Sequence, residues 1–350
     1  MAFSLSGPSV LLGTLVAIAA AASAGPGCAP APAMPATAAT AATNASAAYP
    51  RRAVHLIVPY PAGGGADFWG RLLASRVAES LGQPVVVDNV PGAGGNVGTG
   101  AAARAPADGY TLLLGSTGPL AVHPFTYDAL PFDAARDFVP VGLVESSPIL
   151  LVVHPGVPAS SLSELIALAR ARPGELTFAS NGNGSPEQVA GALFEEKAGV
   201  ELRHVPFDGA GPARKELARG GVTMMFDPCK AALPAIEAGT ELALAVADGR
   251  RSRSLPDVPT FDEAGIHGVE LRIWTGVLAP RGTPPEVVAV VNRAIREALA
   301  TPDLTKAMAD QGSDAGQTSP EAFSTFVEAE RSRWRTLATE TGVRGVSRPL

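Results

Sequence analysis

The chain has 350 residues, of which 46% are hydrophobic and 17% charged, and its formal net charge at pH 7 is −6. A chain of this length can bury sizeable cores and is expected to form about two domains, and this composition excludes a disordered or fibrous protein. The first charged side chain is Arg51, so the whole net charge belongs to that residue and those after it. The sequence therefore predicts a boundary near residue 50.

The first fifty residues have the composition of an export leader followed by a tether. An apolar run from Val10 to Ala22 leads into Ala-Ser-Ala, which predicts a signal peptide over residues 1–24, although this leader has no Lys or Arg. Residues 25–50 are rich in Ala, Pro and Thr, a composition typical of a disordered tether. Attachment of a lipid to Cys28 is the less favoured alternative, because the residues before it resemble a bacterial lipobox poorly. The start codon and the cleavage site stay open.

From Ala53 onward, short β-branched runs alternate with longer amphipathic segments, which is the pattern of helices packed on mostly parallel sheets. The first βαβαβ set is predicted at 54–59 (strand), 67–81 (helix), 84–88 (strand), 95–104 (helix) and 110–114 (strand). An apolar run over 142–153 and a helix over 161–170, with Ser161 as its N-cap, then lead to a second βαβαβ set. Its elements are predicted at 176–180 (strand), 186–198 (helix), 201–206 (strand), 213–219 (helix) and 222–226 (strand).

The C-terminal part of the chain continues the α/β pattern. Residues 242–247 are predicted to form a strand that carries the chain back towards the first set, and residues 273–279 a further strand. Long helices are predicted at 285–300 and 320–339. Two βαβαβ sets joined by extended apolar crossings indicate two similar α/β lobes with a cleft between them, and ligands of open α/β sheets bind outside the carboxyl ends of the strands.

A run of three glycines, in PYPAGGG, lies between the end of the first strand and the start of the first helix. Free backbone N–H groups at a helix N-terminus, together with the helix dipole, favour an anion, and glycine has no Cβ that would shield them. This loop is predicted to hold a carboxylate or a phosphate, with a tight structural turn as the alternative. It is no P-loop, because Arg71 and Leu72 stand where Lys and Ser or Thr are required.

Two further loops follow predicted strands. PGAGGNVG, at 91–98, has the spacing G-x-G-x-x-x-G, which is one residue too long for the dinucleotide fingerprint. SNGNGSP, at 180–186, offers Asn and Ser side chains that can hydrogen-bond a polar ligand, and its Ser185 can cap the helix that begins at Pro186. Ligand binding and simple helix capping stay open as alternatives for this third loop.

No catalytic, metal or cofactor site is predicted. The chain has no nucleophile elbow G-x-S-x-G, and its histidines form no H-x-x-x-H or H-x-H pair. Cys229 is the only cysteine after residue 50, which excludes a disulfide framework and predicts a small buried side chain. A periplasmic reductase with a nucleotide cofactor is the alternative from a different class, and its cofactor fingerprint is missing.

The folded part contains, in this order, the segments PAGGGADFWGRLLASRVAESLGQPVVVDNVPGAGGNVG, ADGYTLLLGSTG, HVPFDGAGPARKELARGGVTMMFD, LPDVPTFDEAG and APRGTPPEVV. These segments resemble the extracytoplasmic solute receptors of tripartite tricarboxylate transporters, the Bug family, and the similarity runs from about Ala53 to Val343. The resemblance implies a two-lobed periplasmic binding protein with a type II-like fold. Residues 53–151 and 246–345 would form lobe 1, and residues 152–245 would form lobe 2.

The resemblance also implies a function without catalysis. Such a protein is periplasmic and monomeric, needs no cofactor and binds no nucleic acid. It closes on a small carboxylate or related anion and delivers it to the permease subunits of a membrane transporter. Carried over position by position, the resemblance predicts a ligand-binding set of Ala62, Gly63, Gly64, Gly65, Asp67, Ser116 and Thr117 in lobe 1, and of Ser180, Asn181, Gly182, Asn183, Ser185, Phe207 and Asp227 in lobe 2.

Three positions depart from the family pattern in the first of these segments. Ala66 replaces a Thr that the family usually has, which removes a possible hydroxyl ligand, and Phe68 and Trp69 are bulkier than the usual aliphatic residues. These departures leave the identity of the ligand open, and they make an aromatic or less polar acid conceivable. Whether the protein serves transport or signalling also stays open.

Overall fold

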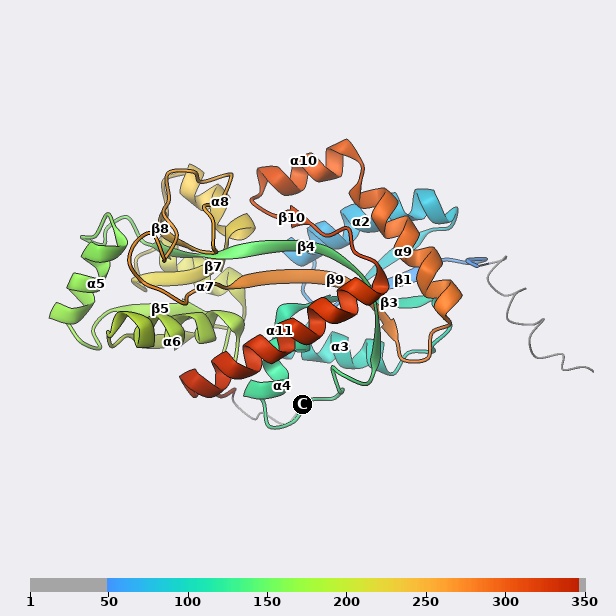
Figure 1. Ribbon diagram of the computed structural model, residues 1–350, viewed down its shortest axis with the longest axis horizontal. Helices are drawn as coiled ribbons and strands as arrows, with labels where there is room; N and C mark the ends of the chain where they lie inside the picture. The colour runs from blue at the N-terminus through green and yellow to red at the C-terminus, as the bar shows by residue number, and fades with distance from the viewer. Residues whose placement is uncertain (1–48, 346–350) are drawn as a thin grey trace, which may run out of the picture. The chain divides into compact units, whose positions relative to one another are not determined.

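The computed structural model describes residues 49–345 and is drawn as a ribbon in Figure 1. The predicted signal peptide, its cleavage site, the tether up to residue 48 and lipid attachment at Cys28 lie outside the described residues. Within residues 49–345, no helix has the length and apolar character needed to cross a membrane.

The first parallel set consists of β1 (Val54–Val58), β2 (Val85–Asn89) and β3 (Thr111–Ser116), with β1 in the middle. Helices α2 (Gly65–Leu81) and α3 (Asn96–Ala103) connect these strands. Helix α2 buries Trp69, Leu73 and Val77, and this spacing of four residues is that of one helix face. The first predicted βαβαβ set is therefore confirmed.

The second parallel set consists of β5 (Thr177–Ser180), β6 (Arg203–Pro206) and β7 (Met224–Pro228), with β5 in the middle. Its connecting helices are α6 (Pro186–Ala198) and α7 (Ala210–Ala218), and α5 (Leu162–Ala171) precedes it. The hydroxyl of Ser161 accepts a hydrogen bond of 3.3 Å from the N–H of Glu164, so Ser161 caps α5 as predicted. The second βαβαβ set is confirmed as well.

Two long antiparallel strands, β4 (Phe138–Val153) and β9 (Arg272–Pro280), run side by side between the two parallel sets (Figure 1). β4 pairs with β9 from Phe138 to Pro148 and then pairs with β7 from Ile149 to Val153. The strand order is β2-β1-β3-β9-β4-β7-β5-β6. A single strand, β4, thus belongs to both parts of the sheet.

The sheet is mixed, whereas the sequence predicts mostly parallel sheets. The strand predicted at 242–247 is confirmed as β8 (Leu242–Ala247), but it does not carry the chain back. It pairs antiparallel with Ile149–Val153 of β4, in the part of the sheet that holds β7. The return is made by β9, which lies antiparallel to both β3 and β4. The run LALAVA is apolar enough for a buried strand in either place, so its composition could not decide between them.

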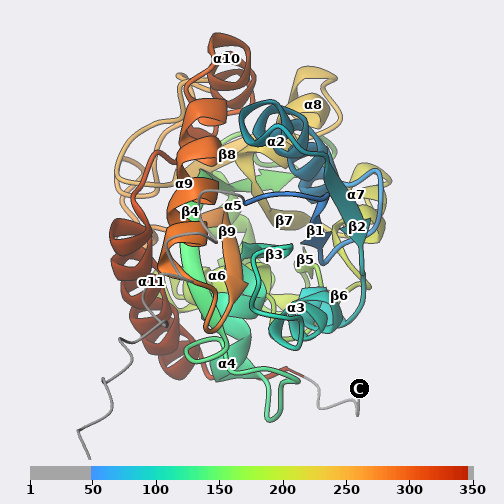
Figure 2. The ribbon, with the colours of Figure 1, turned by 90° about the vertical axis from the view of Figure 1, so that its right-hand side faces the viewer.

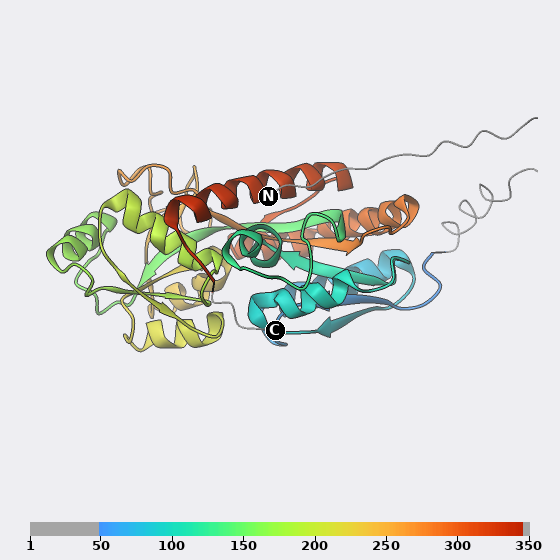
Figure 3. The same cartoon turned by 90° about the horizontal axis from the view of Figure 1, so that it is seen from below.

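Two long helices, α9 (Pro285–Leu299) and α11 (Pro320–Thr341), both contact β4. Helix α9 packs against α2, as Figure 2 shows. Helix α11 contacts both β4 and α6, and Figure 3 shows it lying along β4. Its Phe323 meets Trp274 of β9 edge to face, with ring centroids 5.8 Å apart. Helix α11 therefore contacts the shared strand as well as the second set.

Several short elements were not predicted: η1 (Ala93–Gly95), η2 (Gly118–Val122), α4 (His123–Thr126), α8 (Cys229–Glu237), α10 (Pro302–Asp310) and β10 (Asp314–Ala315). Most of them are too short to show a hydrophobic period, and α8 contains Pro234, which usually argues against a helix interior. Cys229, at the start of α8, is fully buried, as predicted.

Candidate ligand-binding site

The glycine loop joins the end of β1 to the start of α2 and is exposed from Pro61 to Gly65. Gly63 has a φ of +80°, a left-handed conformation that glycine adopts at little cost, whereas Gly64 is extended, with a φ of −84°. Gly64 is the N-cap of α2, and within the described residues no side chain caps this helix. The N–H groups of the first turn of α2 are therefore left for water or a ligand.

The carboxylate of Asp67 is turned towards the protein and holds the glycine loop in place. It accepts hydrogen bonds from Gly63 N at 2.9 Å, Arg71 Nε at 3.0 Å and Asn89 Nδ2 at 3.0 Å, and it is buried. The bond from Arg71, followed by that from Gly63, lowers the pKa of Asp67 to about 2. Asp67 therefore positions Gly63, and the N–H of Gly63 is already used. None of these three hydrogen bonds was predicted from the sequence.

Ser116 and Thr117 follow β3 but use their hydroxyls differently. The hydroxyl of Ser116 lies 2.7 Å from that of Tyr60, which belongs to the glycine loop. Thr117 is fully buried, accepts a hydrogen bond of 2.8 Å from Trp274 N and donates one of 3.3 Å to Trp274 O. Thr117 therefore ties β3 to β9. Tyr60 was not predicted as a site residue, although it lies within PYPAGGG.

The bulky residues after the glycines point in different directions. Trp69 is only 2% exposed and packs in the core with Val58 and Leu73, so its size does not bear on the ligand. Phe68 is 49% exposed and packs its ring against the edge of Trp69, with centroids 5.2 Å apart. Of the two aromatic departures from the family pattern, only Phe68 remains a candidate for ligand contact.

The third loop is held together by the hydroxyl of Ser180. This buried hydroxyl lies 2.6 Å from Nε2 of His204 and donates a hydrogen bond of 3.0 Å to the carbonyl of Gly182. Burial lowers the pKa of His204 to about 4, so the imidazole is neutral at pH 7. Gly182 has a φ of +135°, which favours glycine at this turn. Ser180 thus acts as a positioning residue for the loop.

The rest of the third loop combines helix capping with unused polar groups. Ser185 accepts a hydrogen bond of 3.3 Å from the N–H of Gln188, which confirms the predicted cap of α6. The side-chain Oδ1 of Asn181 is buried and has no hydrogen-bond partner among the described residues. Asn183 contributes its carbonyl, which accepts a bond of 2.9 Å from the hydroxyl of Tyr127. The N–H of Phe207 donates to the carbonyl of Ser180 at 3.1 Å.

Asp227 ends β7 in a buried ion pair that the sequence did not reveal. Arg214, on α7, donates two hydrogen bonds to this carboxylate, at 2.6 and 2.8 Å, and Asp227 is completely buried. Two further buried carboxyl groups, those of Glu187 and Glu241, interact electrostatically with this pair. Burial, followed by the charge of Asp227, raises the pKa of each to about 7. The end of β7 is therefore richer in acidic groups than the sequence indicates.

The two parallel sets meet at the start of α6. A Cβ placed on Gly118, which follows β3, would lie 3.9 Å from Cδ of Pro186, the first residue of α6. Burial raises the pKa of Tyr60 to about 12, and the charge of the nearby Glu187 contributes to this rise. Gly118 therefore lies close to the start of α6, and Tyr60 of the glycine loop is near enough to Glu187 of α6 for its charge to act on the phenol. The predicted ligand-binding set as a whole stays a prediction.

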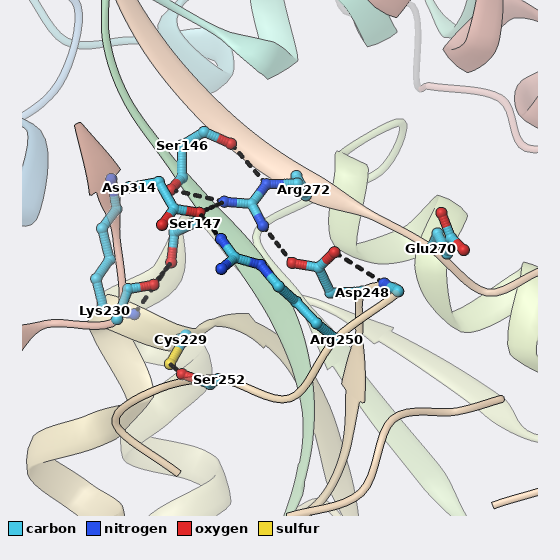
Figure 4. Close-up of polar contacts among 12 residues, drawn as sticks. Ser146, Ser147, Cys229, Lys230, Asp248, Arg250, Ser252, Glu270, Arg272 and Asp314 are labelled. Atoms are coloured by element: carbon cyan, nitrogen blue, oxygen red, sulfur yellow. Dashed lines mark hydrogen bonds and ion pairs between the residues drawn. The ribbon is translucent and has the colours of Figure 1, made fainter. Parts of the chain in front are cut away.

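A polar network joins the crossing strands to the segments that follow β8 and α10 (Figure 4). Arg272 donates to Ser146 Oγ at 2.8 Å and to Asp314 at 2.7 Å, and it also pairs with Asp248. Arg250 donates to the same Asp314 at 2.8 Å. A small cavity beside this network is lined by Arg250, Arg272 and Asp314.

A second buried ion pair lies where β4 crosses between the sets. Lys230, on α8, pairs with Glu145 of β4, and the hydroxyl of Thr275 of β9 donates to the same carboxylate at 2.9 Å. Among residues 49–345, no group of three or more His, Cys, Asp or Glu side chains could hold a metal ion. The charged groups of this region are paired with one another.

Comparison with known proteins gives consistent matches. A family model described as tripartite tricarboxylate transporter family receptor matches residues 70–343. Protein BugT of Bordetella pertussis is 40% identical over 297 residues, which are 85% of this chain and 91% of that protein. The structure of Rpa4515 from R. palustris with adipate has a TM-score of 0.81 and 37% identity, and the match covers 85% of this chain and 100% of that one.

A second solved structure, MatC (Rpa3494) from Rhodopseudomonas palustris with bound malate, has a TM-score of 0.77 and 34% identity. That match covers 83% of this chain and 99% of that one. These similarities confirm the predicted two-lobed α/β binding-protein fold. The family match over most of the chain and the identity to BugT show that this protein belongs to the Bug family of tripartite tricarboxylate transporter receptors.

Proposed function

We propose that this protein is a periplasmic receptor that captures a small carboxylate and delivers it to the permease subunits of a tripartite tricarboxylate transporter. The observation that carries the proposal is the exposed glycine loop, whose N–H groups lead into a first turn of α2 that no described side chain caps. A carboxylate is complementary to such a group of donors. Membership of a receptor family and the adipate bound to Rpa4515 support this choice of ligand.

The proposed cleft lies between two lobes that share the crossing strands. Lobe 1 comprises residues 53–151 and the C-terminal segment, and lobe 2 begins at residue 152. We extend lobe 2 from residue 245 to Leu271, because β8, like β7, pairs with Ile149–Val153 of β4 and because Phe261 packs on Phe194 of α6, with ring centroids 6.0 Å apart. The chain then returns to lobe 1 through β9.

The predicted site residues take two roles in this proposal. Donors for the carboxylate come from the N–H groups of Gly65 and Ala66, since that of Gly64 already donates to the carbonyl of Pro61, and from the hydroxyl pair of Tyr60 and Ser116. The third loop faces them from lobe 2 and contributes its Asn side chains. Positioning residues are those whose side chains are already bonded within the protein, namely Asp67, Thr117, Ser180, Ser185 and Asp227.

A thermal-shift screen with mono-, di- and tricarboxylates tests the proposal. A ligand that binds only the folded state stabilises it by about 2.7 kcal/mol when its concentration is a hundred times its dissociation constant. At least one acid should therefore raise the melting temperature, and titration calorimetry of that acid should give one site per chain. If no carboxylate shifts the melt while a nucleotide does, the protein is not a carboxylate receptor.

A further inference from the structure

Glu187 carries a buried carboxylate oxygen without a partner beside the proposed cleft. The residue lies in the first turn of α6 and is 4% exposed, and its Oε2 has no hydrogen-bond partner within residues 49–345. A buried acceptor without a donor costs free energy, so such a group is normally satisfied by water or by a ligand. Glu187 directly follows Pro186, whose Cδ would lie 3.9 Å from a Cβ placed on Gly118 of lobe 1, so the residue lies where the two lobes approach each other.

The groups around Glu187 do not satisfy this oxygen. Hydrogen bonds from its own N–H and from Ser185 favour its ionised form, as expected for an acid at the start of a helix. Arg214, the nearby cation, already gives two hydrogen bonds to Asp227. On the side of lobe 1, Glu187 is close enough to Tyr60 for its charge to act on the phenol. Oε2 is therefore an acceptor in the region where a bound ligand would lie.

A second acceptor lies in the same loop region. Oδ1 of Asn181 is buried and lacks a partner in the described part of the chain, as Oε2 of Glu187 does. A ligand made only of carboxylates offers acceptors and no donors, so at a pH where Glu187 is ionised it would leave both groups unsatisfied and would be repelled by the charge of Glu187. A ligand that also carries an N–H or O–H group would satisfy them.

We propose that Glu187 determines ligand specificity by accepting a hydrogen bond from an amino or hydroxyl group, so that the ligand is an amino- or hydroxy-substituted carboxylate. This inference rests on the proposed function: the glycine loop binds the carboxylate and Glu187 binds the donor. A protonated amine also neutralises the charge of Glu187, which a hydroxyl does not. The amino acid should therefore bind more tightly than the hydroxy acid of the same carbon skeleton.

Glu241 provides a matched control. It has the same side chain, is also 4% exposed, also carries an Oε2 without a partner among the described residues and also lies near the pair of Asp227 and Arg214. It precedes Leu242, which pairs with Val153 at the end of β4 farthest from the crossing with β9, and it does not act on Tyr60. Glu241→Gln thus repeats the chemical change of Glu187→Gln away from the proposed cleft.

The experiment is titration calorimetry at pH 8, where the carboxyl of Glu187 is ionised, on the full-length mature protein. The probes are matched series, each with a plain, a hydroxy and an amino acid: propionate, lactate and alanine; succinate, malate and aspartate; glutarate, 2-hydroxyglutarate and glutamate. In the series that binds, we expect the amino acid to bind at least ten times more tightly than the plain acid. Glu187→Gln should abolish this preference, whereas Glu241→Gln should retain it. Glu187→Asp, which keeps the charge, should restore part of it.

The outcomes separate this inference from the proposed function. If plain and substituted acids bind equally, or if both Gln variants change the preference alike, Glu187 does not select the ligand, although the protein remains a carboxylate receptor. If no carboxylate of any series binds, the proposed function itself fails. Circular dichroism of each variant establishes that the measured chains are folded. A wild-type protein that binds succinate or glutarate more tightly than their amino acids also overturns the inference.

Discussion

Replacement of Gly63 by Ala separates the geometry of the glycine loop from its binding role. Gly63 has a φ of +80°, and an added Cβ would meet no described atom within 4 Å, so the whole cost of the change is conformational. A left-handed conformation costs an L-residue about 1–2 kcal/mol, and the reduced freedom of the unfolded chain returns about 0.4–1 kcal/mol. We therefore expect Gly63→Ala to lower the free energy of unfolding by about 1 kcal/mol.

The two neighbouring glycines provide controls for this change. Gly64 has a negative φ, and its added Cβ would lie 3.4 Å from the carbonyl of Pro61; Gly65 begins α2, and its Cβ would meet no described atom within 4 Å. Gly65→Ala should be at least as stable as the wild type, because Ala favours a helix more than Gly does, whereas Gly64→Ala replaces a preferred N-cap residue and should cost some stability. Gly65→Ala should nevertheless weaken binding of the carboxylate about tenfold, the equivalent of roughly one charge-assisted hydrogen bond, because its methyl group enters the space in front of the N–H groups.

Urea unfolding followed by circular dichroism measures the first effect, and titration calorimetry of the folded variants measures the second. Gly63→Ala should lower the urea midpoint without a change in the slope m. A Gly63→Ala protein as stable as the Gly65→Ala protein would refute the backbone argument. Unchanged affinity of Gly65→Ala would remove the anion cradle and leave only a structural turn.

Three further predictions concern buried charges and the leader. Arg214→Met leaves a buried carboxylate without its partner and should cost about 3–5 kcal/mol in urea unfolding, whereas Arg219→Met, at the exposed C-cap of the same helix, should cost less than about 1 kcal/mol; equal costs would contradict the burial argument. Burial raises the pKa of Glu187 and Glu241 from 4.5 to about 7, so the folded state holds these protons more tightly than the unfolded state. The free energy of unfolding should therefore fall as the pH rises from 4.5 to about 7, and the double Gln variant should lose this part of the slope; a slope equal to that of the wild type would exclude these two groups. The exported protein should begin near Gly25 on N-terminal sequencing, and an intact Met1 would contradict export through the leader.

Local signals predicted the elements whose ends are set by nearby residues. Helix α6 begins at Pro186 and ends at Ala198, as predicted, because Ser185 caps its start and Gly199 adopts the left-handed conformation at its end. The position of a strand within the sheet was harder to predict from the sequence. β8 has the right bounds but the wrong predicted role, because pairing with β4 depends on residues almost a hundred positions earlier in the chain.

The roles of side chains in the candidate site could not be predicted either, because they also depend on contacts between residues far apart in the chain. Thr117 looks like a free hydroxyl in the sequence, yet it bonds the backbone of Trp274, which is 157 residues away. Asp67 looks like a ligand-binding acid, yet one of its partners is Asn89, at the end of the next strand. The loop motifs thus predicted where in the fold the candidate site lies, and long-range contacts decide which side chains there remain available to bind a ligand.

The strand β4 imposes a condition on how the protein folds. Its N-terminal part completes the sheet next to β9 and its C-terminal part completes the sheet next to β7, without a linker between them. Separation of residues 53–147 from the rest of the chain would take β3 and most of the β9-paired part of β4 away from β9 and leave unpaired backbone groups on these strands. We therefore expect the two lobes to unfold in one cooperative event.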